Sequence, residues 1–259
     1  MIAGIFHQGS GLGNQLFRYV ATRVLALDKG YEWGMIYNPD GSGKEEGFKG
    51  KSFFKGDFLG ERVVHPKMKV WNEKRITENG IDIRSYDPEI NFVEDNTIID
   101  GEFQDERYFR HRMSEIDKWL KVELLKVPDD TCVIGFRGGE FSLYPDLFLT
   151  IDYWNEAIQM MRDKGITKFE VHTDDKPLAE AYFGNQFLVI HDVGINWRSM
   201  RYAKCAIIAN SSFFILPRLL AQKEGPKVGC VTIAPRYWGR RNTKVWSLPQ
   251  NYYKDFLYL

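Results

Sequence analysis

Residues 1–30, MIAGIFHQGSGLGNQLFRYVATRVLALDKG, decide the fold of the chain. The apolar run Ile2–Phe6 predicts a strand, and it is followed by three closely spaced glycines, Gly9, Gly11 and Gly13. A helical pattern then runs from about Gln15 to Leu27, with apolar residues at spacings of four and three. Glycines after a strand let a ligand approach the main chain, and the N–H groups that begin a helix suit an anion. The stretch therefore predicts a strand, a glycine turn and a helix with an anion site.

Further strands and helices are predicted in alternation along the chain. In the first half, strands are expected at Trp33–Tyr37 and Thr97–Ile99, and the buried stripe of a helix at Phe109, Met113, Ile116 and Leu120. In the second half, apolar runs lie at Cys132–Phe136, Phe169–His172, Phe187–Ile190, Ala206–Ala209 and Val228–Ile233. Such alternation favours parallel sheets covered on both faces. We expect an α/β fold of two Rossmann-like domains, residues 1–128 and 129–259, joined near Pro128 and facing a cleft.

Three more local predictions follow from residue types. A helix is expected between Asp152, as its N-cap, and Gly165, just past its end. A terminal helix is expected around Tyr252, Tyr253, Phe256 and Leu257. The segment Asn38–Gly60, rich in Gly, Lys and Phe and without periodicity, is interpreted as a surface loop that sets acceptor specificity.

The composition limits the classes of partner. Lys plus Arg and Asp plus Glu both number 35, so nucleic acid is not an expected partner. The three cysteines are widely spaced, which favours buried free thiols over a disulfide or a metal site: Cys132, Cys205 and Cys230. No apolar run approaches membrane-spanning length and no leader pattern is visible, so we expect a soluble protein in the cytoplasm.

Chemically useful side chains recur where the predicted strands end, which is where open parallel sheets bind ligands. The segments concerned are Gly9–Gln15, Arg137–Glu140, Asp174–Asp175, Asn210–Ser212 and Ala234–Arg236. Glycines, arginine, hydroxyls and carboxylates together suit a nucleotide, whose diphosphate needs cations and N–H donors. Simple helix capping remains the alternative for the Asp pair and for the Ser pair. The histidines at strand ends, His7, His172 and His191, are too scattered to predict a metal site.

Several of these segments, in order, resemble the inverting α-1,2-fucosyltransferases, the galactoside 2-fucosyltransferase family. GLGNQLFRYVATRVLA resembles the family's opening GGLGNQ(M/L)FQYA, and IIDGEFQDERYF resembles its GY(F/W)QSEKYF segment. FRGGEF takes the place of HxRRGD(Y), followed by LTIDYWNEAI for the family's dYYxkAi helix and FEVHTDD for F(y)xFSDD. MRYAKCAIIANSSF and VTIAPRYW match the two segments that follow, so the resemblance spans Gly11 to Trp238.

The resemblance implies a GT-B fold and a glycosyltransferase that moves fucose from GDP-fucose to a hydroxyl of a galactose-containing glycan. It implies inversion at the anomeric carbon and no metal or other cofactor. The partners would be a nucleotide sugar and a glycan, with transient contact to a lipid-linked glycan as one option. Carried over by motif position, the donor-binding residues are Gly11, Gly13, Asn14, Arg137, Asp174, Asp175, Asn210, Ser211 and Ser212.

The chain departs from the family at the central motif. Gly135 replaces the histidine, Gly138 the second arginine and Glu140 the aspartate. These departures leave open a different nucleotide-sugar donor, or a protein that binds the nucleotide or glycan without catalysis. A dinucleotide-dependent oxidoreductase is disfavoured, because the strand Trp33–Tyr37 is followed by Asn38 and Pro39 rather than by an acidic residue.

Two catalytic roles are predicted from the chemistry. A departing diphosphate needs preorganised cations and amide donors, and the planar, permanently charged guanidinium of Arg137 suits this task. Removal of the acceptor proton needs a general base, for which Glu140 is the candidate by position.

Overall fold

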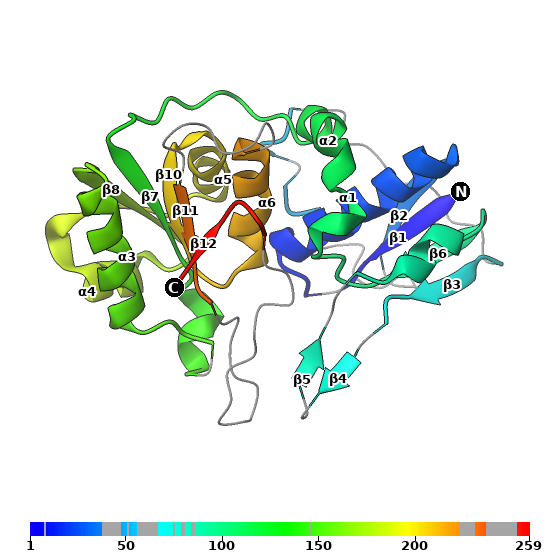
Figure 1. Ribbon diagram of the computed structural model, residues 1–259, viewed down its shortest axis with the longest axis horizontal. Helices are drawn as coiled ribbons and strands as arrows, with labels where there is room; N and C mark the ends of the chain where they lie inside the picture. The colour runs from blue at the N-terminus through cyan, green and yellow to red at the C-terminus, as the bar shows by residue number, and fades with distance from the viewer. Residues whose placement is uncertain are drawn as a thin grey trace. The chain divides into compact units, whose positions relative to one another are not determined.

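A computed structural model gives the fold of each half of the chain (Figure 1). It describes residues 1–7, 9–37, 48–50, 52–55, 67–74, 76–78, 81–83, 86–145, 147–222, 231–236 and 253–259. The chain forms two compact units, Met1–Val122 and Glu123–Leu259. Most of the predicted loop Asn38–Gly60, together with Cys230 and Tyr252, lies outside the described residues.

The first unit is built on a parallel sheet in the order β2-β1-β6-β3. Its strands are β1 (Ile2–Phe6), β2 (Trp33–Tyr37), β3 (Lys69–Asn72) and β6 (Thr97–Asp100). All of β1 is buried, as expected for an apolar strand with neighbours on both sides. A separate antiparallel pair joins β4 (Ile76–Glu78) to β5 (Ile81–Ile83). The strands predicted from the first half of the sequence are confirmed.

Helix α1 (Leu12–Lys29) packs on β1 and β2 of this sheet. It begins after Gly11 and ends at Gly30, whose φ of +69° is the left-handed conformation that glycine adopts without strain. The predicted stripe Phe109, Met113, Ile116 and Leu120 is buried, with α2 (Met113–Trp119) at its centre. Short 3₁₀ turns connect the elements at Pro88–Phe92, Glu106–Tyr108 and Arg110–Arg112.

The second unit is a doubly wound parallel sheet in the order β12-β11-β10-β7-β8-β9. Its strands are β7 (Thr131–Phe136), β8 (Lys168–Thr173), β9 (Leu188–Ile190), β10 (Cys205–Ile208), β11 (Val231–Ala234) and β12 (Leu257–Tyr258). In Figure 1, α3 (Ile151–Asp163) and α4 (Lys176–Phe183) cover one face, and α5 (Val193–Tyr202) and α6 (Ser212–Ala221) cover the other. A 3₁₀ turn at Gly139–Leu143 follows β7, and another at Gly184–Gln186 follows α4. The predicted α/β fold with two Rossmann-like units is confirmed.

Two local predictions are wrong. The N-cap of α3 is Thr150, and Asp152 lies inside the first turn, where its negative charge still favours the helix N-terminus. The expected terminal helix is absent from residues 253–259, where Leu257 and Tyr258 instead pair with β11 as an edge strand. Gly165 follows α3 with a φ of +86°, as predicted.

Two further observations concern cysteines and membrane helices. Cys132 and Cys205 are buried free thiols on neighbouring strands, as predicted. Among the described helices, none combines the length and the apolar character that a membrane span requires.

Candidate functional site

The strand order of the second unit fixes where a ligand is expected. From β7 the chain moves outward through β8 and β9, then returns to the other side of β7 as β10. The switch point therefore lies between β7 and β10, and open α/β sheets bind ligands at the carboxyl ends of strands there. The two strands are in register at Ile208 and Gly135, and Ala209 N donates to Gly135 O at 2.9 Å. Residues just after Gly135 and Ala209 thus flank one point.

Arg137 follows β7 at this switch point and forms an ion pair with Asp174, which follows β8. The other carboxylate oxygen of Asp174 accepts the Gly138 N–H at 2.9 Å. The guanidinium also lies 5.2 Å from the ring centroid of Phe141 and 3.7 Å from the Glu140 carboxylate. Burial lowers the pKa of Arg137 from its ordinary value, yet an arginine remains charged at neutral pH. We call Arg137, Asp174 and Gly138 the Arg137 cluster.

Exposure distinguishes the members of this region. The side chains of Arg137 and Asp174 are 28% and 29% exposed, so the ion pair is held by the protein and still accessible. Glu140 is 69% exposed and lies 3.7 Å from Arg137. The cluster thus presents a fixed cation at the sheet edge.

Glycines around Arg137 are required by space. A Cβ at Gly139 would lie 2.3 Å from Asp174 Oδ2, and the φ of Gly139 is +28°. A Cβ at Gly138 would lie 2.8 Å from the Asp175 Cβ. The lack of a side chain at Gly139 therefore lets the Asp174 carboxylate approach the main chain, and the lack of one at Gly138 leaves room for Asp175.

Gly135 is the residue that replaces the histidine of the related motif, and its surroundings leave no room for that ring. A Cβ at this position would lie 2.8 Å from the terminal methyl of Met200 and 2.9 Å from the ring of Phe214. The departure from the motif is thus built into the core of the unit.

The remaining predicted residues of this unit hold local structure. Asp175 caps α4 by accepting the Leu178 N–H at 3.1 Å, which confirms the capping alternative for this residue. Asn210 is buried and donates to Leu147 O at 3.0 Å. Ser211 is buried as the N-cap of α6 but makes no side-chain capping bond, and Ser212 begins the helix. These residues place the N-terminus of α6 at the switch point beside β7.

In the first unit, the predicted glycine turn connects β1 to α1. Gly9 has a φ of +75°, Gly11 is the N-cap, and Gly13 is buried in the first turn of the helix. A Cβ at Gly9 or Gly11 would meet no atom within 4 Å, so at Gly9 the conformation, rather than the space, calls for glycine. Asn14 accepts a hydrogen bond from Gln104 Nε2 at 3.1 Å.

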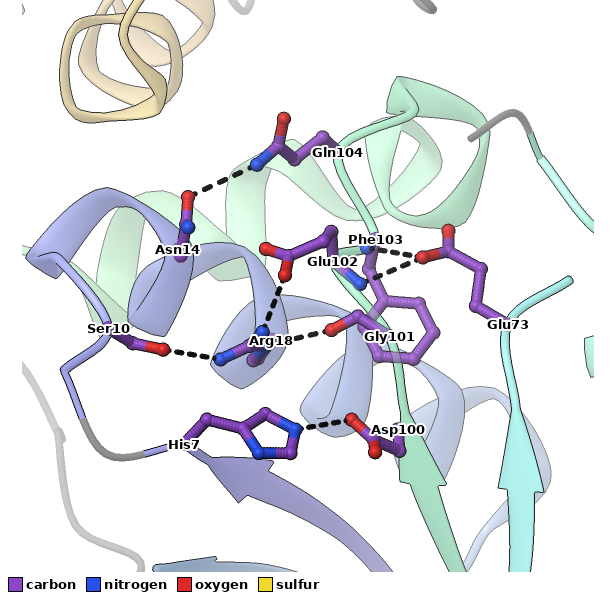
Figure 2. A network of polar contacts seen from close by, with 10 residues as sticks. All are labelled: His7, Ser10, Asn14, Arg18, Glu73, Asp100, Gly101, Glu102, Phe103 and Gln104. Carbon is purple, nitrogen blue, oxygen red and sulfur yellow. Dashed lines mark hydrogen bonds and ion pairs between the residues drawn. The ribbon is translucent and has the colours of Figure 1, made fainter. Parts of the chain in front are cut away.

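Arg18 ties this turn to the end of β6, a role that sequence reasoning missed. Figure 2 shows its buried guanidinium donating to Ser10 Oγ at 2.7 Å and to Gly101 O at 2.8 Å. It also forms an ion pair of 2.7 Å with Glu102. Its position in α1 was visible in the sequence, but its partners Gly101 and Glu102 lie more than eighty residues away.

A second cluster missed from the sequence pairs His7 with Asp100 (Figure 2). His7 follows β1, Asp100 is the last residue of β6, and their side chains are 2.7 Å apart at Nε2 and Oδ1. β1 is the switch strand of this sheet, with β2 on one side and β6 on the other. The strand-end rule could have found Asp100, because this residue directly follows the predicted strand Thr97–Ile99.

The backbone after Asp100 is strained and held by a carboxylate. Phe103 is fully buried with a φ of +50°, which is unusual for a bulky residue. Glu73 Oε2 accepts the N–H groups of Glu102 at 2.8 Å and Phe103 at 3.3 Å. Such strain persists only where surrounding contacts enforce it, and it is common at functional sites.

Within the described part of the chain, no group of three His, Cys, Asp or Glu side chains is arranged to hold a metal ion.

No protein-family model matches the chain, and no curated protein matches it either. Among solved structures, the chain resembles E. coli heptosyltransferase WaaC with ADP, at 12% identity and a TM-score of 0.48, over all of this chain and 92% of that one. It also resembles NodZ alpha-1,6-fucosyltransferase soaked with GDP-fucose, at 13% identity and a TM-score of 0.42. That match covers 85% of this chain and 92% of the other. A glycosyl transferase family 9 protein from Veillonella parvula matches at 12% identity and a TM-score of 0.44. That match covers all of this chain and 86% of the other. TM-scores below 0.5 do not assign a family.

Proposed function

We propose that the chain is a glycosyltransferase whose second unit binds the diphosphate of a nucleotide sugar. The observation that carries the proposal is the place of Arg137, a fixed and accessible cation at the switch point between β7 and β10. The N-terminus of α6 begins at the same point and adds a positive dipole end and N–H donors.

The proposed chemistry is displacement of the nucleoside diphosphate by an acceptor hydroxyl, with inversion at the anomeric carbon. Positive charge develops on the sugar ring and negative charge on the leaving diphosphate. Arg137 neutralises the leaving group with two parallel N–H donors, so the proposal assigns this role to a side chain rather than to a metal ion. The acceptor is assigned to the first unit.

The donor and acceptor are proposed from the motif resemblance. GDP-fucose is the first donor to test, and a galactose-ended glycan the first acceptor. The packing around Gly135 gives specific support to a different donor, because no histidine can stand there to contact the base.

A non-catalytic binding protein is the second candidate. It is supported by the Asp174 carboxylate, which already offsets the charge of Arg137 in the absence of a second arginine at Gly138. Such a protein would bind a nucleotide and leave the sugar bond intact.

A nucleotide panel followed by a turnover assay tests these proposals. Thermal stabilisation by GDP, UDP, ADP, dTDP and CMP identifies the base, because a ligand that binds only the folded state raises the melting temperature. Release of GDP from GDP-fucose is then measured with and without lactose. Stabilisation with acceptor-dependent release supports the transferase, and stabilisation without any release supports the binding protein. No stabilisation by any nucleotide contradicts both.

A further inference from the structure

We propose that His7, oriented by Asp100, is the general base that takes the proton from the acceptor hydroxyl. The inference rests on the proposed function and adds a catalytic residue to it. The residue concerned is not among those implied by the motif resemblance.

The fold places both residues at one edge of the first sheet. β1 and β6 are parallel neighbours, paired from Ile2 with Thr97 to Gly4 with Ile99, so their carboxyl ends coincide. His7 comes directly after β1, and its ring turns back to Asp100 at the end of β6 (Figure 2). Switch strands place ligands at such a point, and the glycine turn begins two residues later at Gly9.

The hydrogen bond selects the tautomer of the ring. A carboxylate can only accept a hydrogen bond, so Nε2–H is the donor to Asp100 Oδ1. Nδ1 then bears the lone pair of the neutral ring. Among the residues that the structure describes, none forms a hydrogen bond with Nδ1. The His7 side chain is 38% exposed, so part of it is open to solvent.

The two side chains are held in place by their main chains and by Arg18. His7 O accepts the Ser10 N–H at 3.1 Å, and Asp100 O accepts the Glu73 N–H at 2.8 Å. Arg18 joins Ser10, three residues after His7, to Gly101, which directly follows Asp100. Arg18 forms its ion pair with Glu102, whereas Asp100 pairs with the His7 ring.

The acceptor oxygen bonds to the anomeric carbon as its proton moves to His7 Nδ1, and the bond from that carbon to the diphosphate oxygen breaks with its electron pair. The products are the glycoside, the nucleoside diphosphate and a protonated His7, which returns its proton to water. Asp100 stabilises the imidazolium that forms, which is the role of a positioning carboxylate.

Glu140 is a weaker candidate for this role. Its side chain is 69% exposed, and its nearest charged neighbour is Arg137 at 3.7 Å. His7 is less exposed than Glu140, and its partner is a carboxylate rather than a cation.

The chain offers a matched control for the experiment. His111 Nε2 lies 2.6 Å from Asp28 Oδ2, which is the same residue pair in the same unit. Asp28 is near the C-terminal end of α1, about 25 Å along the helix from the glycine turn. The experiment compares wild type with three variants, His7→Gln, Asp100→Asn and His111→Gln. The donor is GDP-fucose, or the sugar form of the nucleotide that the panel selects. Lactose is the acceptor, and melting temperatures verify folding.

We expect His7→Gln to lower kcat by about 10²- to 10⁴-fold with the nucleotide Kd unchanged. Asp100→Asn should lower kcat with little change in KM, because it removes the carboxylate that orients the ring and leaves acceptor binding intact. His111→Gln should match wild type. The inference is overturned if the kcat of His7→Gln is within threefold of wild type, or if His111→Gln loses as much kcat as His7→Gln. In either case, nucleotide binding by wild type still upholds the proposed function. Wild type that binds no nucleotide contradicts the proposed function itself.

Discussion

Asp174 joins Arg137 to the main chain: one carboxylate oxygen pairs with the guanidinium and the other accepts the Gly138 N–H. Arg137 follows β7, the strand at the switch point, and its guanidinium is fixed by a carboxylate that follows the neighbouring strand β8. Preorganisation of this kind is what electrostatic stabilisation of a leaving group requires.

Gly139→Ala should disturb this arrangement. The added Cβ would fall 2.3 Å from Asp174 Oδ2, so the carboxylate must move and release Arg137. We expect weaker nucleotide binding by calorimetry together with a lower melting temperature. Gly165→Ala is the control, because Gly165 has a φ of +86° but no atom near its Cβ position. It should lower the melting temperature and leave the nucleotide Kd unchanged; an equal loss of binding in both variants would refute the role of Asp174.

Gly135→His, which restores the residue of the related motif, should destabilise the second unit. Its side chain would overlap Met200 and Phe214, and overpacking of a core costs about 1–3 kcal/mol or more. Denaturation midpoints in urea measure this, with Gly11→Ala as a control that has a φ of −65° and open space around it. A Gly135→His protein as stable as wild type would show that the site can open to admit the ring.

Arg218→Met should lower the free energy of unfolding by about 3 kcal/mol or more. The buried guanidinium donates to Met200 O at 2.8 Å, Ala203 O at 2.7 Å and Thr232 Oγ1 at 2.9 Å. Each buried acceptor left without a donor costs about 1–3 kcal/mol.

The control is Arg198→Met, which breaks a surface contact of 3.3 Å to the exposed Glu123. Equal urea midpoints for the two arginine variants would contradict the claim that Arg218 stabilises the second unit by joining α6 to the end of α5 and to β11.

Cys132 should resist alkylation in the folded protein. Burial, and secondarily the neighbouring Cys205, raises the pKa of the Cys132 thiol well above its ordinary value, so the reactive thiolate is scarce at neutral pH. Mass spectrometry after treatment with iodoacetamide should find Cys132 unmodified in buffer and modified in urea. Similar labelling rates in both conditions would show that β7 is exposed in the native protein.

Much of the fold could be predicted because it depends on local patterns. Buried parallel strands such as Ile2–Phe6 and Cys132–Phe136 are continuous apolar runs, and the glycines mark the turns between strand and helix. The terminal strand β12 could not be predicted in this way, because its two residues form a strand only through pairing with β11. Aromatic residues such as Tyr253 and Phe256 are compatible with either state, so the tertiary contact decided it.

The site was predictable in part. Arg137 and Asp174 were found because each follows an apolar strand. Their pairing was not, because it depends on Gly139, where a side chain would block the approach of the carboxylate. His7 and Asp100 are 93 residues apart, and only the order of strands β1 and β6 brings them together.

The affinity of the Arg137→Ala variant for a nucleoside diphosphate tests the central claim most directly. Calorimetric titration with GDP, or with the diphosphate that stabilises wild type most, is compared between wild type, Arg137→Ala and Arg162→Ala. Arg162 lies 5.7 Å from the ring centroid of Phe169, so this control removes an arginine of the same unit that also stacks on an aromatic ring.

Loss of charge-assisted hydrogen bonds should weaken binding to Arg137→Ala by about 10- to 100-fold and lower turnover by orders of magnitude, with the fold intact. Arg162→Ala should bind as wild type does. Equal affinities for wild type and Arg137→Ala would contradict the claim that this guanidinium holds the diphosphate.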